Sequence, residues 1–123
     1  EAVSSYNHPL EHPDTPDYII NSHFLAADMY NKAQNDTNAL LSYQQAISLY
    51  ADSENKEINE RVFWARYQIG SIYARQENNE QALKIFKELV DHKDGEGQLW
   101  KKLAAENHRS IARKLAYDDY LKE

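Results

Sequence analysis

The stretch from residue 63 to residue 96 constrains the fold of this chain more than any other part. It predicts two amphipathic helices, because its apolar residues recur at steps of three and four. Between them lies a polar turn, residues 76–79, whose two asparagines enter a turn at low cost. We expect the small residues Gly70 and Ala82 to face each other and to let the two helices approach closely. The expected inner faces carry Ile69, Gly70 and Tyr73 in the first helix and Ala82, Leu83, Phe86 and Leu89 in the second.

A second copy of this pattern lies upstream, in residues 17–51. Its first helix is expected to begin with Thr15 as N-cap, Pro16 in the first turn and Asp17 favourable against the helix dipole. A polar turn at residues 35–38 then leads into the second helix. Five positions agree with the central hairpin in size and order: Ala27 with Gly70, Tyr30 with Tyr73, Ala39 with Ala82, Tyr43 with Phe86, and Ala46 with Leu89.

This order of small and aromatic residues resembles the tetratricopeptide repeat. The resemblance covers residues 17–106. It implies an all-α fold of antiparallel helical hairpins in a right-handed superhelix, and a function in binding other proteins. Within the family, the chain is most similar to repeat proteins of the bacterial cell envelope, such as the TolA-binding and outer-membrane-assembly proteins. Their second helices are likewise rich in Tyr and Gln.

The composition supports the all-α prediction. The chain has 123 residues, enough for one domain, and 41% of them are hydrophobic. Its three prolines all lie before residue 17, so the rest of the chain contains no helix-breaking proline. We divide the expected single domain into a preceding segment (1–16), a first hairpin (17–51), an extended connection (52–62), a second hairpin (63–96) and a capping helix (97–123).

The two repeats are spaced more widely than the period of the family. Ala27 and Gly70 are 43 residues apart, whereas the family repeats about every 34 residues. We place the additional residues in the connection, as a longer helix, a longer loop or both. The expected break lies at residues 52–55, with Ser53 or Asn55 capping a helix that starts near Lys56 and runs into the central repeat.

Residues 1–16 admit two interpretations. Ala2 and Tyr6 have the spacing of Ala82 and Phe86, and Pro13 follows where the family ends a second helix. This pattern indicates the remnant of a preceding repeat, and in that case the chain is part of a larger protein. The alternative is a loosely held tail.

The last quarter of the chain begins in register with the repeats and then departs from them. Trp100 and Ala104 match the pattern of a first helix, but Asn107 stands where an aromatic residue belongs. We expect one long helix that packs on the last repeat and shields its apolar end from water. A third hairpin is the alternative, supported by Ala116 and Tyr120 at repeat spacing. The expected apolar stripe consists of Leu99, Leu103, Ile111, Leu115 and Leu121.

The sequence offers no arrangement of residues typical of a catalytic or metal site. Among five histidines, His8 and His12 are separated by Pro9, which breaks any helix that would align them. His23 lies at a core-facing position and is expected to pack rather than bind a ligand. Cysteine is absent, and so are the HExxH, phosphate-loop and Gly-x-Ser-x-Gly motifs. We therefore expect no enzymatic activity, no cofactor and no metal.

Charge is distributed unevenly along the chain. The formal net charge is −6; residues 1–62 carry 3 basic and 10 acidic side chains, and residues 63–123 carry 11 and 10. Binding of nucleic acid usually requires a basic surface, so we do not expect it. The acidic half is interpreted as a solvated surface; attraction of a basic partner is the alternative. No apolar run approaches the length of a membrane span, so we expect no direct insertion into a membrane. The lack of cysteine fits a reducing cytoplasm or a bacterial envelope, and the family resemblance favours the envelope.

The resemblance also implies which residues meet a protein or peptide partner. In this family the first helices of the hairpins line a concave surface. The large aromatic residues among the matching positions are the most informative, because exposed aromatics are costly unless something covers them. For Trp64, packing against the preceding connection is the alternative. The matching residues are Asn21, Phe24, Asp28, Asn31, Trp64, Tyr67, Ser71, Arg75, Lys101 and His108.

Two further expectations concern the kind of partner. Some family members clamp a terminal carboxylate with Lys and Asn, and Phe24 and Asp28 occupy those places here. Because Asp28 would repel a carboxylate, we do not expect recognition of this type. Self-association is the alternative function, through an open N-terminal end that exposes Ile19, Ile20 and Tyr30. A regulatory domain of a larger enzyme is the third hypothesis.

Overall fold

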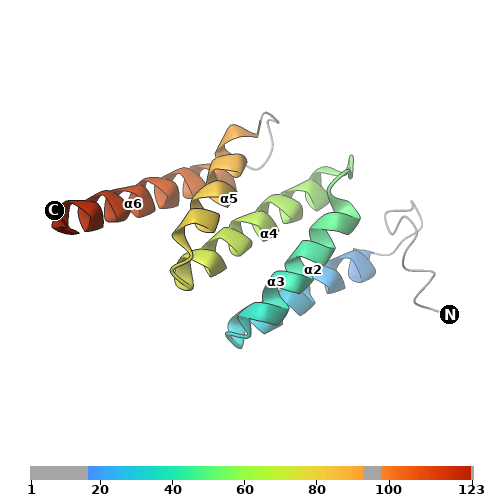
Figure 1. The fold of residues 1–123 in the computed structure, drawn as a ribbon. Helices are drawn as coiled ribbons and strands as arrows, with labels where there is room; N and C mark the ends of the chain where they lie inside the picture. The colour runs from blue at the N-terminus through green and yellow to red at the C-terminus, as the bar shows by residue number, and fades with distance from the viewer. Residues whose placement is uncertain (1–16, 93–97, 123) are drawn as a thin grey trace. The chain divides into compact units, whose positions relative to one another are not determined.

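The structure is a computed structural model that describes residues 17–92 and 98–122, and the side chains from residue 19 on. In these ranges the chain forms helices and no strand, which confirms the all-α prediction. The predictions for residues 1–16, including the Thr15 cap, lie outside the described residues. The helices are α2 (Asp17–Lys32), α3 (Asp36–Tyr50), α4 (Lys56–Arg75), α5 (Asn79–Asp91) and α6 (Gln98–Lys122), as Figure 1 shows.

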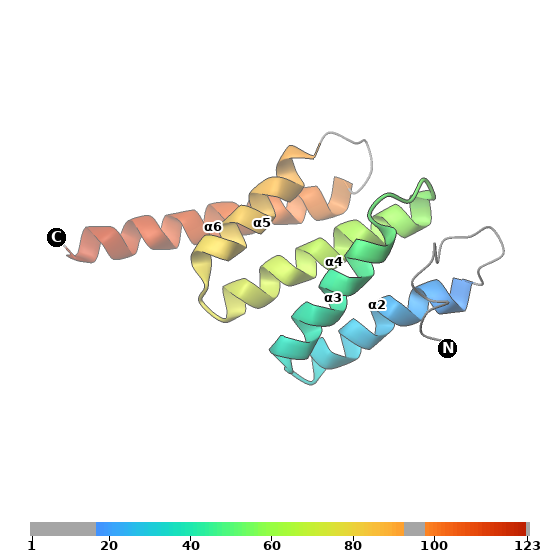
Figure 2. The ribbon, with the colours of Figure 1, turned by 45° about the vertical axis from the view of Figure 1, so that its right-hand side comes forward.

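The chain divides into two compact units, residues 1–65 and 66–123. Of the described residues, the first unit contains α2, α3 and the beginning of α4. The second contains the rest of α4 together with α5 and α6. Within the first unit α2 packs on α3, and within the second α5 packs on α6, as both ribbon views show (Figures 1 and 2).

The turns within the two hairpins have the same backbone structure. After α2, Gln34 adopts a positive φ of 59°, and after α4, Glu77 adopts 61°. The N–H of the next residue then donates to a carbonyl five residues back, from Asn35 to Tyr30 and from Asn78 to Tyr73, at 2.9 Å in both cases. This is the Schellman arrangement that ends a helix and satisfies its last carbonyls. The turn predicted at residues 76–79 is confirmed. The turn predicted at residues 35–38 lies earlier, at residues 33–35, because α3 already begins at Asp36.

The small residues of the repeat pattern are buried, as expected. Ala27, Ala39 and Ala82 are fully buried, and Gly70 is also buried. A Cβ atom placed on Gly70 would lie 2.7 Å from Cε1 of Phe86, well inside van der Waals contact. Because the Phe86 ring occupies this space, only glycine allows α4 and α5 to pack at their present separation.

Of the expected connection 52–62, only residues 52–55 lie outside a helix. Helix α4 already begins at Lys56, as the cap analysis predicts, so residues 56–62 are helical. The Oδ1 atom of Asn55 accepts hydrogen bonds from the N–H groups of Glu57 at 2.8 Å and Ile58 at 3.3 Å. This confirms Asn55 as the cap of the helix. Ser53 supports it, because its Oγ atom accepts a bond from the Asn55 N–H at 2.9 Å.

Helix α6 runs without interruption through the described residues, so the alternative of a third hairpin is wrong. Asn107 occupies the position of the aromatic residue in the repeat pattern, and its side chain makes hydrogen bonds there. Its Nδ2 atom donates to the Tyr67 hydroxyl and to the Leu103 carbonyl, both at 2.8 Å. The predicted apolar stripe is covered only in part. Leu103, Ile111 and Leu115 are half-buried, whereas Leu99 and Leu121 are exposed.

Candidate functional site

A groove of about 370 Å³ lies in the first unit, beside the outer face of α2. We call it the α2–α4 groove. Its wall on α2 contains two large apolar side chains that solvent reaches, Leu25 at 53% and Met29 at 71% of their surface. They are four residues apart and therefore share one face of the helix. The lining residues are Leu25, Asp28, Met29, Asn31 and Lys32 from α2, Tyr43 from α3 and Trp64 from α4.

Two aromatic rings and one carboxylate form the interior of the groove. The rings of Tyr43 and Trp64 meet edge to face, with centroids 5.8 Å apart and an interplanar angle of 80°. Tyr43 is fully buried, and its hydroxyl donates a hydrogen bond of 2.6 Å to Oδ1 of Asp28. A short bond of this kind between a phenol and a carboxylate holds both groups in a fixed geometry. The groove therefore has a rigid base under an exposed apolar wall.

The environment of Asp28 disfavours the ionised form of its carboxyl group. Burial raises the pKa of this carboxyl above its ordinary value. The hydrogen bond from Tyr43 and the positive charges of Arg61 and Lys32 act in the opposite direction but do not cancel the effect of burial. The groove thus holds a carboxylate that is partly desolvated and has a hydrogen-bond donor from its own chain.

Replacing Asp28 by asparagine is expected to raise thermal stability slightly at pH 7 and to leave it unchanged at about pH 3. The folded-state pKa is raised, so the stabilisation from this group is present below the ordinary aspartate pKa and is lost as the pH rises through the folded-state value. Asparagine carries no charge and still accepts the bond from Tyr43. Thermal unfolding followed by circular dichroism at both pH values measures the difference.

The matched control for this prediction is Asp28→Ala. Alanine removes the acceptor and leaves the hydroxyl of the buried Tyr43 without this bond. The loss should be about 1–3 kcal/mol at both pH values. If the alanine and asparagine variants are equally stable, the bond does not have the structural role that we assign to it.

The structure gathers three of the predicted partner-binding residues in the α2–α4 groove: Asp28, Asn31 and Trp64. Trp64 is half-buried, and its ring contacts that of Tyr43 of α3. Sequence reasoning missed Leu25 and Met29 as parts of this surface. The available signal was their spacing of four residues on α2, on the face away from Ala27.

The prediction that Phe24 lies on the binding surface is wrong. Phe24 is fully buried, and its ring centroid lies 5.8 Å from that of Tyr50. The reason is the register of α2. Ile20, Phe24 and Ala27 follow steps of four and three and share the core face. His23 lies at the edge of this face, half-buried and edge-on to Tyr50 at 5.7 Å, which confirms that it packs. Burial also lowers the pKa of His23.

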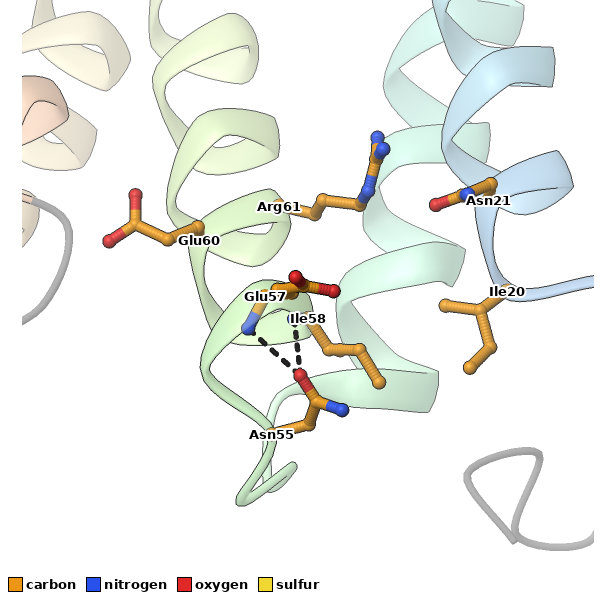
Figure 3. A pocket seen from close by; sticks show the side chains of 7 residues that line it. All are labelled: Ile20, Asn21, Asn55, Glu57, Ile58, Glu60 and Arg61. Carbon is orange, nitrogen blue, oxygen red and sulfur yellow. Dashed lines mark hydrogen bonds between the residues drawn. The ribbon is translucent and has the colours of Figure 1, made fainter. Parts of the chain in front are cut away.

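Asn21 lies in a different pocket of the first unit, of about 440 Å³. Figure 3 shows Arg61 extending from α4 toward Asn21 of α2, whereas Glu60 points away. The base is apolar, because Ile20 and Ile58 are buried. The Asn55 side chain is already engaged in capping α4 (Figure 3). The full lining consists of Ile20, Asn21, Asn55, Glu57, Ile58, Glu60 and Arg61.

The remaining predicted residues belong to the second unit. Tyr67 is half-buried, with its ring centroid 5.7 Å from those of Phe86 and Trp100. On α4, Ser71 is half-buried and Arg75 is exposed, and on α6 Lys101 is half-buried. His108 lines a pocket with residues of α5 rather than with the other predicted residues.

Helical hairpins with the same turn and the same buried small residues define a helical-repeat protein. Two segments, residues 22–53 and 64–92, match the family model of the tetratricopeptide repeat. Both hairpins are therefore tetratricopeptide repeats, and the prediction of this family is confirmed. Such repeats generally mediate interactions between proteins, and the family is generally non-catalytic. Comparison with curated proteins and with solved structures returned no match.

Two searches of the structure bear on other classes of site. Within residues 17–92 and 98–122, no three side chains of His, Cys, Asp or Glu lie together as metal ligands would. Over the same part of the chain, none of the helices is both long enough and apolar enough to cross a membrane.

Proposed function

We propose that this chain binds a protein or peptide partner without catalysis, and that the α2–α4 groove receives an apolar side chain of that partner. The observation that carries the proposal is the exposure of Leu25 and Met29 beside the half-buried Trp64. Exposed apolar side chains next to an aromatic ring are typical of interaction sites. Methionine adapts to different partner surfaces because its side chain is unbranched and polarizable.

The charged residues of the groove support an internal segment of the partner as the ligand. Asp28 and Lys32 place opposite charges on α2, one turn apart. The half-buried carboxylate and the exposed ammonium group can bind the N–H and C=O groups of an extended peptide. The negative charge of Asp28 disfavours a terminal carboxylate at this place. The expected ligand therefore presents an apolar side chain between polar backbone groups, not a free C-terminus.

Met29→Glu is expected to weaken partner binding strongly, because it places a charge on the apolar wall. Loss of a central contact of this kind costs about 2 kcal/mol or more, which corresponds to roughly a thirtyfold loss of affinity. Met29 is exposed, so the change should leave folding within about 0.5 kcal/mol. Partners captured by the native chain from cells of its source are identified by mass spectrometry, and their affinities are then measured by calorimetry.

Leu41→Glu is the matched control for this experiment. Leu41 of α3 is also a large apolar residue, 60% exposed, and it does not line the groove. A partner that binds through the groove should be lost with Met29→Glu and kept with Leu41→Glu. Equal affinity of the native chain and the Met29→Glu variant would reject the groove as the binding site.

Self-association receives less support from the structure. That hypothesis expects Ile19, Ile20 and Tyr30 to be exposed at the N-terminal end. Tyr30 is 39% exposed, but Ile19 is half-buried and Ile20 is 5% exposed. Sedimentation of the native chain at several concentrations tests it, since a monomer at all concentrations rejects it.

We also propose that the chain belongs to the cell envelope of a bacterium. The support is the composition of α3, in which Tyr43 and Tyr50 flank Gln44 and Gln45. Fractionation of cells that contain the native protein tests this placement.

A further inference from the structure

The second unit contains a pocket of about 300 Å³ between α5 and α6, which we call the α5–α6 pocket. We propose that it binds an acidic segment of a partner protein, with an Asp or Glu carboxylate on Arg109 and Lys87 and an apolar neighbour on Val90. This site is separate from the α2–α4 groove and does not depend on it. The lining residues are Lys87, Val90 and Asp91 from α5 and Ala105, His108 and Arg109 from α6.

The geometry of the pocket follows from helical periodicity. Each helix contributes three residues at steps of three and one, so that each triad forms a single face. The apolar residues of the lining are Val90 and Ala105. Val90 is 39% exposed and open to a ligand. At the rim are groups that donate hydrogen bonds, namely the ammonium of Lys87, the imidazole of His108 and the guanidinium of Arg109.

The charge of the rim is positive. Asp91 is the only acidic residue among those that line the pocket, and it accepts a hydrogen bond of 3.0 Å from Lys87. This ion pair is largely exposed and is therefore weak, so Lys87 can turn toward a ligand at little cost. Arg109 is exposed and can bind a carboxylate with two parallel N–H bonds.

The positive charge continues along α6 beyond the pocket. Lys102, Arg109 and Arg113 are separated by seven and four residues, so they lie on one face of the helix, and all three are exposed. Between residues 101 and 114 the helix carries five basic residues and one acidic residue, although the whole chain has a net charge of −6. A local positive surface on an acidic protein favours an acidic ligand at this place.

The pocket fits a peptide better than a nucleic acid. Its volume is at the lower end of the range of ligand pockets, which is enough for one or two amino-acid side chains. An apolar base beside a cationic rim matches a carboxylate side chain next to an aliphatic one. A phosphate backbone would use only the cationic residues and would leave the apolar residues Val90 and Ala105 without a matching contact.

The experiment uses the full chain and a fluorescein-labelled peptide, Glu-Asp-Glu-Leu-Glu-Asp-Leu-Asp-Glu, with binding measured by fluorescence anisotropy. At about 50 mM salt, Arg109→Glu is expected to weaken the affinity about tenfold or more. The matched control is Lys122→Glu, the same reversal of charge on the same helix about 20 Å away, which should change the affinity less than about twofold. Circular dichroism of each variant verifies the helix content.

Two further peptides test the apolar contact and the charge preference separately. A peptide with serine in place of both leucines should bind more weakly, because it loses the contact with Val90. A peptide with lysine in place of its acidic residues should bind the Arg109→Glu variant more tightly than the native chain, because the charge preference is reversed.

Four results would overturn the proposal. The first is absence of binding of the acidic peptide to the native chain, and the second is equal weakening by Arg109→Glu and Lys122→Glu. The third is binding of a single-stranded oligothymidine as tight as that of the peptide, which would indicate a nucleic-acid site. The fourth is concentration-dependent dimerisation that Arg109→Glu abolishes, which would make a second copy of the chain the occupant.

Discussion

Replacing Gly70 by leucine is expected to lower the free energy of unfolding by about 3 kcal/mol. Even a single Cβ atom at this position would lie 2.7 Å from Phe86, whose ring is fully buried. The better helix propensity of leucine returns about 1 kcal/mol and does not compensate for the overlap. Urea unfolding followed by circular dichroism measures the loss, and hydrogen exchange of the α5 amides locates it in the second hairpin.

Two variants make this prediction specific. Ala112→Leu places the same side chain at an exposed position of α6 and should change stability by less than about 0.5 kcal/mol. Phe86→Ala alone should cost about 3–5 kcal/mol, because it leaves a cavity. Combined with Gly70→Leu it should cost much less than the sum, since leucine fills that space. Additive costs would show that Gly70 and Phe86 do not compete for the same volume.

Phe24→Ala is expected to destabilise the chain by about 3–5 kcal/mol, because Phe24 is fully buried against Tyr50. The adjacent residue provides the control. Leu25 is 53% exposed, and Leu25→Ala should cost less than about 1 kcal/mol. Urea unfolding of the two variants, measured under the same conditions, gives the comparison. If both variants lose a similarly small free energy of unfolding, Phe24 is not a core residue and the register of α2 described above is wrong.

Much of the fold was predictable because local chemistry specifies it. Both hairpin turns lie where polar residues interrupt the apolar pattern, and Asn55 caps α4 where a cap was expected. The continuity of α6 follows from the absence of turn residues after Asn107. Capping, turn formation and helix propensity act over a few residues, so a single sequence is sufficient to locate them.

The candidate site was less predictable, because it depends on how far each helix is rotated about its axis. On α2 the apolar residues are numerous enough to form two stripes, one through Ile20 and Phe24 and another through Leu25 and Met29. Only packing against α3 decides which stripe is buried. The same holds for His108, which was expected on the concave partner-binding surface and which lines a pocket with residues of α5.

By itself the sequence determined the class of the protein, namely helical hairpins that match the tetratricopeptide repeat. It also determined that the small residues at positions 27, 39, 70 and 82 are buried. These features are set by the size of side chains and by their spacing along one helix. Only the tertiary structure decided that Phe24 lies in the core, that Tyr43 holds Asp28 and that Lys87 and Arg109 share a pocket. The physical reason is that such contacts join residues of different helices, and their geometry is settled when the helices pack.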